Sequence, residues 1–203
     1  MDIRAGAYVC ALAAAGVVML SEPSERKDAH EDTPELYAPN TISTADNELN
    51  SAFMPDGRTV YFTRKAGADG KLGVILVSRL QRDGQWGTPE VASFSGHYPD
   101  YDPFVSPDGS RLFFISTRPI AEHGPSRDFN IWFVDRSGTG WTAARNLGSP
   151  VNGDGDELYP SIALDGTLYF SGCGRKDSRG RCDLYRSRYR DGHYLDPETL
   201  GDS

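Results

Sequence analysis

The stretch DYDPFVSPDGSRLFF (residues 100–114) decides the fold of this chain, because related copies stand before and after it. The copies are ELNSAFMPDGRTVYF (residues 48–62) and ELYPSIALDGTLYF (residues 157–170). In each copy an acid stands eight residues before the aspartate of a DG pair, and an alternating aromatic segment follows the glycine. Alternation of period two beside a DG turn is typical of a β-hairpin. We therefore predict three structural repeats.

The rest of each repeat predicts two further strands. A third apolar segment follows a variable loop, and a fourth segment opens with an aromatic residue after a glycine-containing turn. The opening residues are Gly73, Phe129 and Cys182 for the third segment, and Trp86, Trp141 and Tyr194 for the fourth. Four short strands per repeat, stacked on their neighbours, make the blade of a β-propeller. We predict an all-β chain with blades at about residues 47–95, 99–150 and 154–200.

The DG pairs are predicted to be structural turns, because aspartate accepts hydrogen bonds from its own turn and glycine adopts positive φ. These residues are Asp56, Gly57, Asp108, Gly109, Asp165 and Gly166. The third copy departs from the other two: Leu164 replaces the proline before the turn, and one residue fewer follows the glycine.

The repeat pattern, acid-x-x-[PS]-x-x-x-[PL]-D-G-x-x-[VL]-[YF]-F, resembles the WD40-like repeat family called PD40, which occurs in TolB-type propellers and many exported proteins. The likeness covers about residues 47–200. It implies a ring of roughly six blades, of which three are visible here, and a non-catalytic role in binding a protein partner. A partial ring predicts either a fragment or copies that self-associate to complete the ring. Its two end faces are expected to be exposed. The segment TPELYAPNTIST (residues 33–44) resembles the end of the first blade and predicts one more outer strand.

Composition and the N-terminal segment suggest where the chain works. The net charge of -8 argues against binding to nucleic acid. The run from Ala5 to Leu20 is uncharged, so residues 1–20 are interpreted as a signal-peptide-like leader and residues 21–35 as a flexible tether to a propeller over residues 36–203. A buried helix is the alternative, and a stable membrane span is not expected because it needs about 20 apolar residues. The predicted location is the periplasm or the medium.

The candidate binding residues are the acids at the start of each blade and the charged residues of the loops beside them. They are Glu48, Asp100, Asp102, Asp156, Glu157, Arg118, His123 and Arg175. They are predicted to gather on one face of the disc, as a binding mouth for a ligand or protein partner. The alternative is that each acid accepts backbone N–H bonds at the start of its own blade.

No catalytic residue is predicted, and a binding module is favoured over an enzyme. The competing hypothesis is a glycan-processing enzyme, sialidase-like or lyase-like, that uses acid pairs such as Asp100 and Asp102. No cofactor is expected. Asn152, Asp154 and Asp156 place oxygen ligands at every second residue, as calcium loops do, although the pattern then fails and a solvated loop is the plainer interpretation.

Cys173 and Cys182 bracket an eight-residue loop between two predicted strands. In an oxidising compartment this spacing suits a disulfide, and two free thiols are the alternative.

Overall fold

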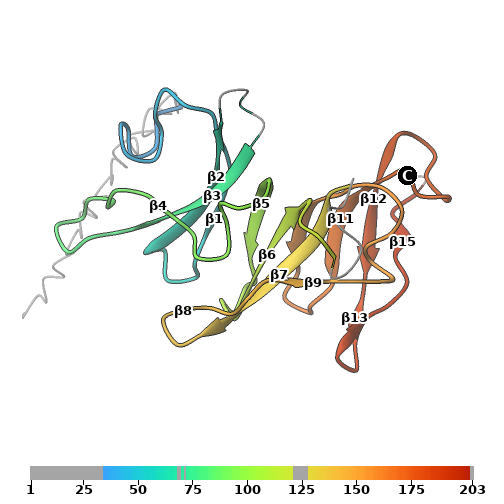
Figure 1. Ribbon diagram of the computed structural model, residues 1–203. Coiled ribbons are helices and arrows are strands. Elements are labelled where there is room, and N and C mark those ends of the chain that lie inside the picture. The colour runs from blue at the N-terminus through green and yellow to red at the C-terminus, as the bar shows by residue number, and fades with distance from the viewer. Residues whose placement is uncertain (1–33, 68–69, 71, 121–127, 202–203) are drawn as a thin grey trace, which may run out of the picture. The chain divides into compact units, whose positions relative to one another are not determined.

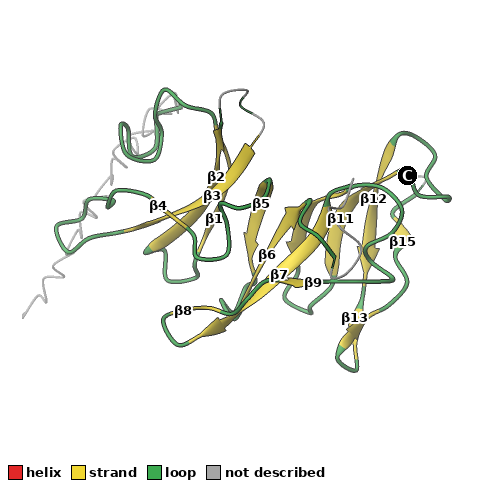
Figure 2. Ribbon diagram, viewed as in Figure 1, coloured by secondary structure: helices red, strands yellow, loops and turns green. Residues whose placement is uncertain are grey.

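The computed structural model describes residues 34–67, 70, 72–120 and 128–201, and a compact unit begins at Leu36. Strands, turns and loops make up this part of the chain, without helices (Figure 1 and Figure 2). Accordingly, no helix in the described ranges is long and apolar enough to cross a membrane.

The first blade is an antiparallel meander (Figure 1). It contains β1 (Glu48–Phe53), β2 (Thr59–Ala66), β3 (Leu72–Arg79) and β4 (Glu90–Val91). The second blade contains β5 (Asp100–Val105), β6 (Arg111–Ser116), β7 (Asn130–Ser137), β8 (Gly140–Trp141) and β9 (Arg145–Asn146). The third contains β10 (Glu157–Ile162), β11 (Leu168–Cys173), β12 (Cys182–Ser187) and β15 (Glu198–Thr199), with β13 (Tyr189–Arg190) and β14 (His193–Tyr194) as a separate hairpin. The predicted all-β class and the repeat of four-stranded blades are confirmed.

The DG turns adopt one geometry in all three blades. The glycines have φ of 65°, 69° and 83°, and each aspartate accepts the N–H two residues later, at 2.8, 3.0 and 2.9 Å. The shorter third turn closes with Ala163 N–H donating to the Thr167 carbonyl, whereas the first closes from Met54 to Thr59. Losing one residue therefore shortens the hairpin without changing its turn.

The fourth strand, predicted to open with an aromatic residue, is split into two short pairings. The opening aromatic pairs first with a residue at or just after the end of the third strand, as Trp86 with Leu80, Trp141 with Arg136 and Tyr194 with Tyr189. The chain then rejoins the sheet a few residues later, as β4, β9 or β15. The glycine-containing turn between the third and fourth strands thus points the aromatic ring toward the junction with the preceding blade or segment.

Two apolar cores join the three blades. The first contains Tyr61 and Ile75 of blade one with Phe114 and Val134 of blade two. The second joins blade two to blade three in the same manner, and its fully buried members include Leu168, Phe170 and Tyr185. The sheet of blade two lies between these cores and buries both faces, which is why β6 and β7 read as nearly continuous apolar runs.

A partial ring was expected to expose two apolar end faces. The outer face of blade one is instead partly covered, and the outer face of blade three is partly polar. On blade one, Val60 and Phe62 are buried in a small core with Ile42 from the preceding segment. On blade three, Ser171 and Arg186 occupy the positions where blade two has Ile115 and Phe133. Arg186 also pairs with Glu198 at 2.9 Å. Polar side chains therefore reduce the hydrophobic surface of the last blade, although Leu184 is 61% exposed.

The predicted extra outer strand does not form in residues 34–47. This segment makes one isolated bridge, Pro39 with Ser43, and folds as a turn. An outer strand needs an unpaired third strand beside it, and among the described residues β3, β7 and β12 already pair with β4, β9 and β15. Ile42 still occupies the position of Phe94 and Val151, six residues before the acid of the next blade.

Candidate functional site

Each inner strand carries a bulge at the same place, two residues after its opening acid. The pairing register of β1, β5 and β10 shifts around Asn50, Asp102 and Tyr159. These residues have φ of 44°, 53° and 53°. Left-handed backbone in non-glycine residues is uncommon, costs about 1–3 kcal/mol each and is concentrated at functional sites. A bulge also redirects a side chain out of the regular pleat.

The three bulges converge on the carboxylate of Asp102. The Asn50 side-chain amide donates to Oδ1, and the Tyr159 N–H donates to Oδ2 at 3.3 Å. One residue from each blade therefore meets at this acid. Asp102 is only 8% exposed, and burial raises the pKa of its carboxyl, an effect that the bonds from Tyr159 and Asn50 oppose only in part.

A cavity of about 470 Å³ opens over Asp102. Its polar lining includes Asn50, Lys65 and Asp102, and its aromatic lining includes Tyr101, Phe129 and Tyr159. The rings of Tyr101 and Phe129 meet edge to face, 5.7 Å apart, while Tyr159 is 62% exposed. This size and mixture of apolar walls with a few polar groups is typical of small-ligand pockets.

The opening acids of the blades lie elsewhere, in ion pairs with arginines in or just after the second strand. Asp100 accepts from Arg118 Nη2 at 2.7 Å, and Glu157 accepts from Arg175 Nη1 at 3.1 Å. Both carboxylates are fully buried. Eighteen residues separate the partners in both pairs. Glu48 forms a more exposed version of this pair with Arg64, which stands 16 positions later in the chain.

These arginines also bind the preceding blade. Arg118 donates to the Phe94 carbonyl at 3.0 Å and stacks over Phe114, with its guanidinium carbon 4.8 Å from the ring centroid. Arg175 donates to the Val151 carbonyl at 2.8 Å. Each pair therefore ties the end of one blade to the start of the next. Asp100 and Glu157, predicted to line a binding mouth with Arg118 and Arg175, pair with these arginines instead of facing the cavity over Asp102. The alternative, acceptance of backbone N–H groups, is seen at Glu157, which also accepts from Gly153.

Within the described ranges, both carboxylate oxygens of Asp100 accept hydrogen bonds, whereas only one oxygen of Glu157 does. Ser95 Oγ donates to the second oxygen of Asp100 at 2.7 Å. Glu157 Oε1 accepts from Arg175 and from Gly153 N–H, but Oε2 is buried without a hydrogen-bond partner among the described residues. Burial raises the pKa of Glu157 to about 7 despite the lowering effects of Gly153 and Arg175.

The calcium candidates are occupied with backbone contacts. Asp156 Oδ1 accepts the Phe129 N–H at 2.8 Å, and Asn152 Oδ1 accepts the Ile131 N–H at 2.9 Å. These contacts fasten the start of blade three to β7. Asp154 lines a separate loop cavity with Arg175. In the part of the chain that the structure describes, no group of three His, Cys, Asp or Glu side chains could hold a metal ion. His123 lies outside the described residues.

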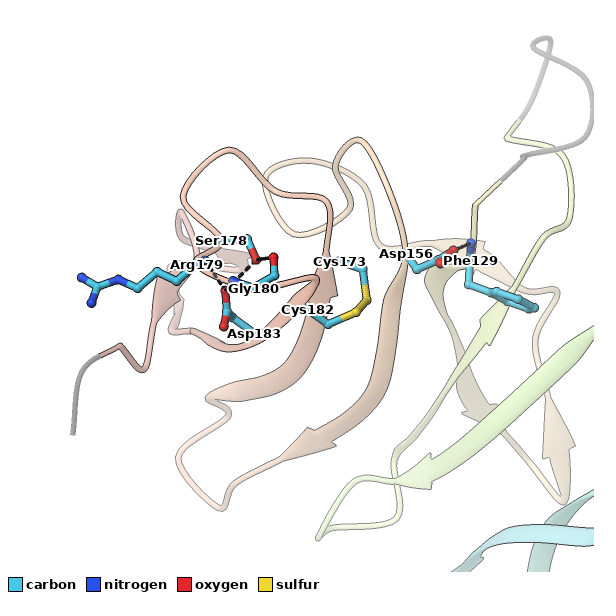
Figure 3. Close-up of a disulfide and its surroundings, with 8 residues drawn as sticks. All are labelled: Phe129, Asp156, Cys173, Ser178, Arg179, Gly180, Cys182 and Asp183. Atoms are coloured by element: carbon cyan, nitrogen blue, oxygen red, sulfur yellow. Dashed lines mark hydrogen bonds between the residues drawn. A yellow bond between two sulfur atoms is a disulfide. The ribbon is translucent and has the colours of Figure 1, made fainter.

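Cys173 and Cys182 form a disulfide between β11 and β12, with an S–S distance of 2.03 Å (Figure 3). The loop between them folds back on Asp183, whose Oδ2 accepts from Ser178 Oγ and from the Arg179 and Gly180 N–H groups. The cross-link thus closes the loop that carries Arg175.

Replacing both cysteines with serine is expected to lower the free energy of unfolding by about 2–3 kcal/mol, because the unfolded chain regains the entropy of an uncrosslinked loop. Urea unfolding of the double variant measures the loss. Wild-type protein unfolded with dithiothreitol should match the variant. Equal stability of the oxidised, reduced and variant forms would contradict the expectation.

Asn50 and Tyr159 were missed by the sequence reasoning, which predicted only Asp102 of these three. The available signal was positional: each is the second residue after the opening acid of an aligned block. Asn and Asp tolerate left-handed backbone but Tyr does not, so no single residue type marks the three positions. The bulge that brings them together depends on strand pairing and is not readable from one strand.

No family model matches the chain, and no curated protein matches it. Among solved structures, a periplasmic gluconolactonase from Pseudomonas aeruginosa is similar with a TM-score of 0.43 and 17% identity, over 70% of this chain and 39% of that one. An α-L-arabinofuranosidase from Clostridium thermocellum is similar with a TM-score of 0.42 and 15% identity, over 81% and 58%. This chain thus spans less than two thirds of either structure. Neither likeness bears on its activity.

Proposed function

We propose that this chain is an exported, non-catalytic binding module of the PD40 type, and that the cavity over Asp102 holds a neutral, sugar-sized ligand. The repeat pattern supports the family. The uncharged leader sequence and the Cys173–Cys182 disulfide support export to the periplasm or the medium, because disulfides persist in oxidising compartments.

The convergence of the three bulges on Asp102 carries the proposal. A carboxylate offers about four acceptor positions. The bonds from Asn50 and Tyr159 use two, so two remain for ligand hydroxyls. The exposed ring of Tyr159 offers an apolar platform beside them. Hydroxyl acceptors next to an aromatic face suit a sugar ring, which presents hydroxyls at its edge and C–H groups on its face.

Turnover of a glycan is the weaker candidate. Glycosidases use two carboxyl groups that flank the scissile bond. Among the described residues lining this cavity, Asp102 is the one acid, while Asp100 and Glu157 are committed to arginines. Binding without cleavage therefore accounts for the residues present.

Asp102→Asn is expected to weaken ligand binding at least about tenfold, because it removes a charged acceptor from the ligand hydroxyls. The probes are cellobiose, maltose, lactose and chitobiose, titrated into the full chain by calorimetry. Tyr159→Asn should also weaken binding, while asparagine tolerates the left-handed backbone at that position. Asp83→Asn, in an exposed turn where Asp83 accepts the Gln85 N–H, is the matched control and should bind as wild type.

The same preparations are then incubated with p-nitrophenyl glycosides. Release of nitrophenol that Asp102→Asn abolishes would replace the binding proposal with an enzyme. Failure of every sugar to bind would favour the protein partner that the repeat family implies.

A further inference from the structure

The DG-turn side of the blades carries two equivalent sites, one at each junction, and they differ in size. Between blades one and two the cavity measures about 80 Å³, and between blades two and three about 420 Å³. The lining residues correspond by their distance from the DG turn and by their strand pairing. The corresponding pairs are Met54 and Ser106, Tyr61 and Phe113, Arg136 and Tyr189, and Trp141 and Tyr194.

The first junction is filled by the chain's own side chains. The Trp141 indole lies against Tyr61, with ring centroids 6.0 Å apart, and its Nε1 donates to the Tyr61 hydroxyl at 2.8 Å. Met54 is buried, and its sulfur lies 3.8 Å from Arg136 Nη1. An indole and a thioether thus occupy the space between the blades.

The second junction has smaller side chains at three of these four positions, although Arg111 stands where the first junction has Thr59. Ser106 replaces the methionine, and its hydroxyl is turned toward its own turn, where it donates to Asp108 at 2.6 Å. Tyr194 replaces the indole, and Phe113 lacks the hydroxyl that would receive a hydrogen bond from it. The cavity that results opens beside Leu164, which is 93% exposed.

We propose that the cavity between blades two and three binds a small aryl-alkylamine, cationic at neutral pH, whose planar aromatic ring takes the place that Trp141 and Met54 occupy one junction earlier. The equivalent site between blades one and two already accepts an indole, which shows that this kind of junction can hold a ring of that size. This site lies at the opposite end of the inner hairpins from Asp102 and is independent of the function proposed for that residue.

Charge at the rim selects an amine over an acid. Arg111, the cation of the lining, is paired with Asp135 at 2.7 Å. Asp108 lies at the same rim, and hydrogen bonds from Ser106 and Ser110 lower the pKa of its carboxyl to about 2. Asp108 is therefore ionised at neutral pH and attracts a cationic ligand group.

The test titrates tryptamine, indole and indole-3-acetate into the 15N-labelled full chain and follows amide shifts. Tryptamine should give saturable shifts at the turn residues Ser110 and Gly166 and should bind at least about threefold more tightly than indole-3-acetate. Tyr194→Trp should weaken tryptamine binding at least about tenfold, because the added ring fills the cavity. Tyr37→Trp, at a half-exposed tyrosine away from this junction, is the matched control and should bind as wild type.

Leu164→Lys tests the same cavity if Tyr194→Trp does not fold. Leu164 is exposed, so its substitution should leave the fold unchanged. Its ammonium group should repel tryptamine and weaken binding at least about fivefold. Shifts scattered over the whole chain would overturn the proposal. So would unchanged binding in Tyr194→Trp and Leu164→Lys.

Discussion

Asp100→Ala is expected to lower the free energy of unfolding by about 3–5 kcal/mol, the range for removing one partner of a buried ion pair. Asp100 is fully buried and accepts from Arg118 Nη2 at 2.7 Å. Its removal leaves a guanidinium, itself 11% exposed, without its charge partner, and leaves Ser95 Oγ without its acceptor. Equilibrium unfolding in urea measures the change.

The matched control is Glu90→Ala, which breaks the exposed pair between Arg79 and Glu90. That pair spans 3.5 Å with side chains 54% and 74% exposed, so the expected loss is below about 1 kcal/mol. The double variant Asp100→Leu with Arg118→Met should recover much of the loss, because no charge is then buried alone. If Asp100→Ala is as stable as Glu90→Ala, the ion pair of Asp100 with Arg118 does not hold blades one and two together.

Glu157 is expected to make the chain less stable as pH rises from 4.5 to about 7. Burial raises its pKa from 4.5 to about 7 on folding, so within this interval the unfolded chain releases a proton that the folded chain retains. Stability falls with rising pH wherever the folded state binds more protons. The contribution is fully present below 4.5 and is lost as pH rises through about 7, a total of about 3 kcal/mol.

Glu157→Gln should remove this contribution to the slope, since glutamine does not titrate. The measurement is the free energy of unfolding in urea at several pH values across the interval. Glu90→Gln, at an exposed acid, should leave the slope as in wild type. If the free energy of unfolding of Glu157→Gln changes with pH as it does in wild type, the pKa of Glu157 is not raised on folding. Burial of Oε2 without a partner would then not destabilise the ionised carboxyl as expected.

The turns and the blades could be predicted because their signals are local. Asp56, Asp108 and Asp165 accept N–H groups two residues away, and the glycines supply positive φ, so a few neighbouring residues suffice. The pairing of Cys173 with Cys182 was also one of the two options that spacing allowed, and the structure contains it.

The sequence identified charged residues as binding candidates, but it could not predict which partners each of them contacts. Asp100 and Asp102 are two positions apart in one strand, yet Asp100 binds Arg118 while Asp102 meets Asn50 and Tyr159. The bulge between Tyr101 and Phe104 separates their roles, and it exists only in the pairing of β5 with β6. An arginine 18 residues after an acid was visible in two blades but had no meaning before the loop geometry was known.

By itself, the amino-acid sequence determined the all-β class, the number of blades in this chain and the place of each DG turn, because these follow from short-range alternation and turn chemistry. Only the tertiary structure decided which acids form buried ion pairs, which one faces a cavity, and which junction between blades is filled by side chains. Those outcomes depend on side chains about 50 residues apart, such as Asn50 and Asp102, meeting across neighbouring sheets. Contacts at that distance follow from the stacking of blades, which no single repeat encodes.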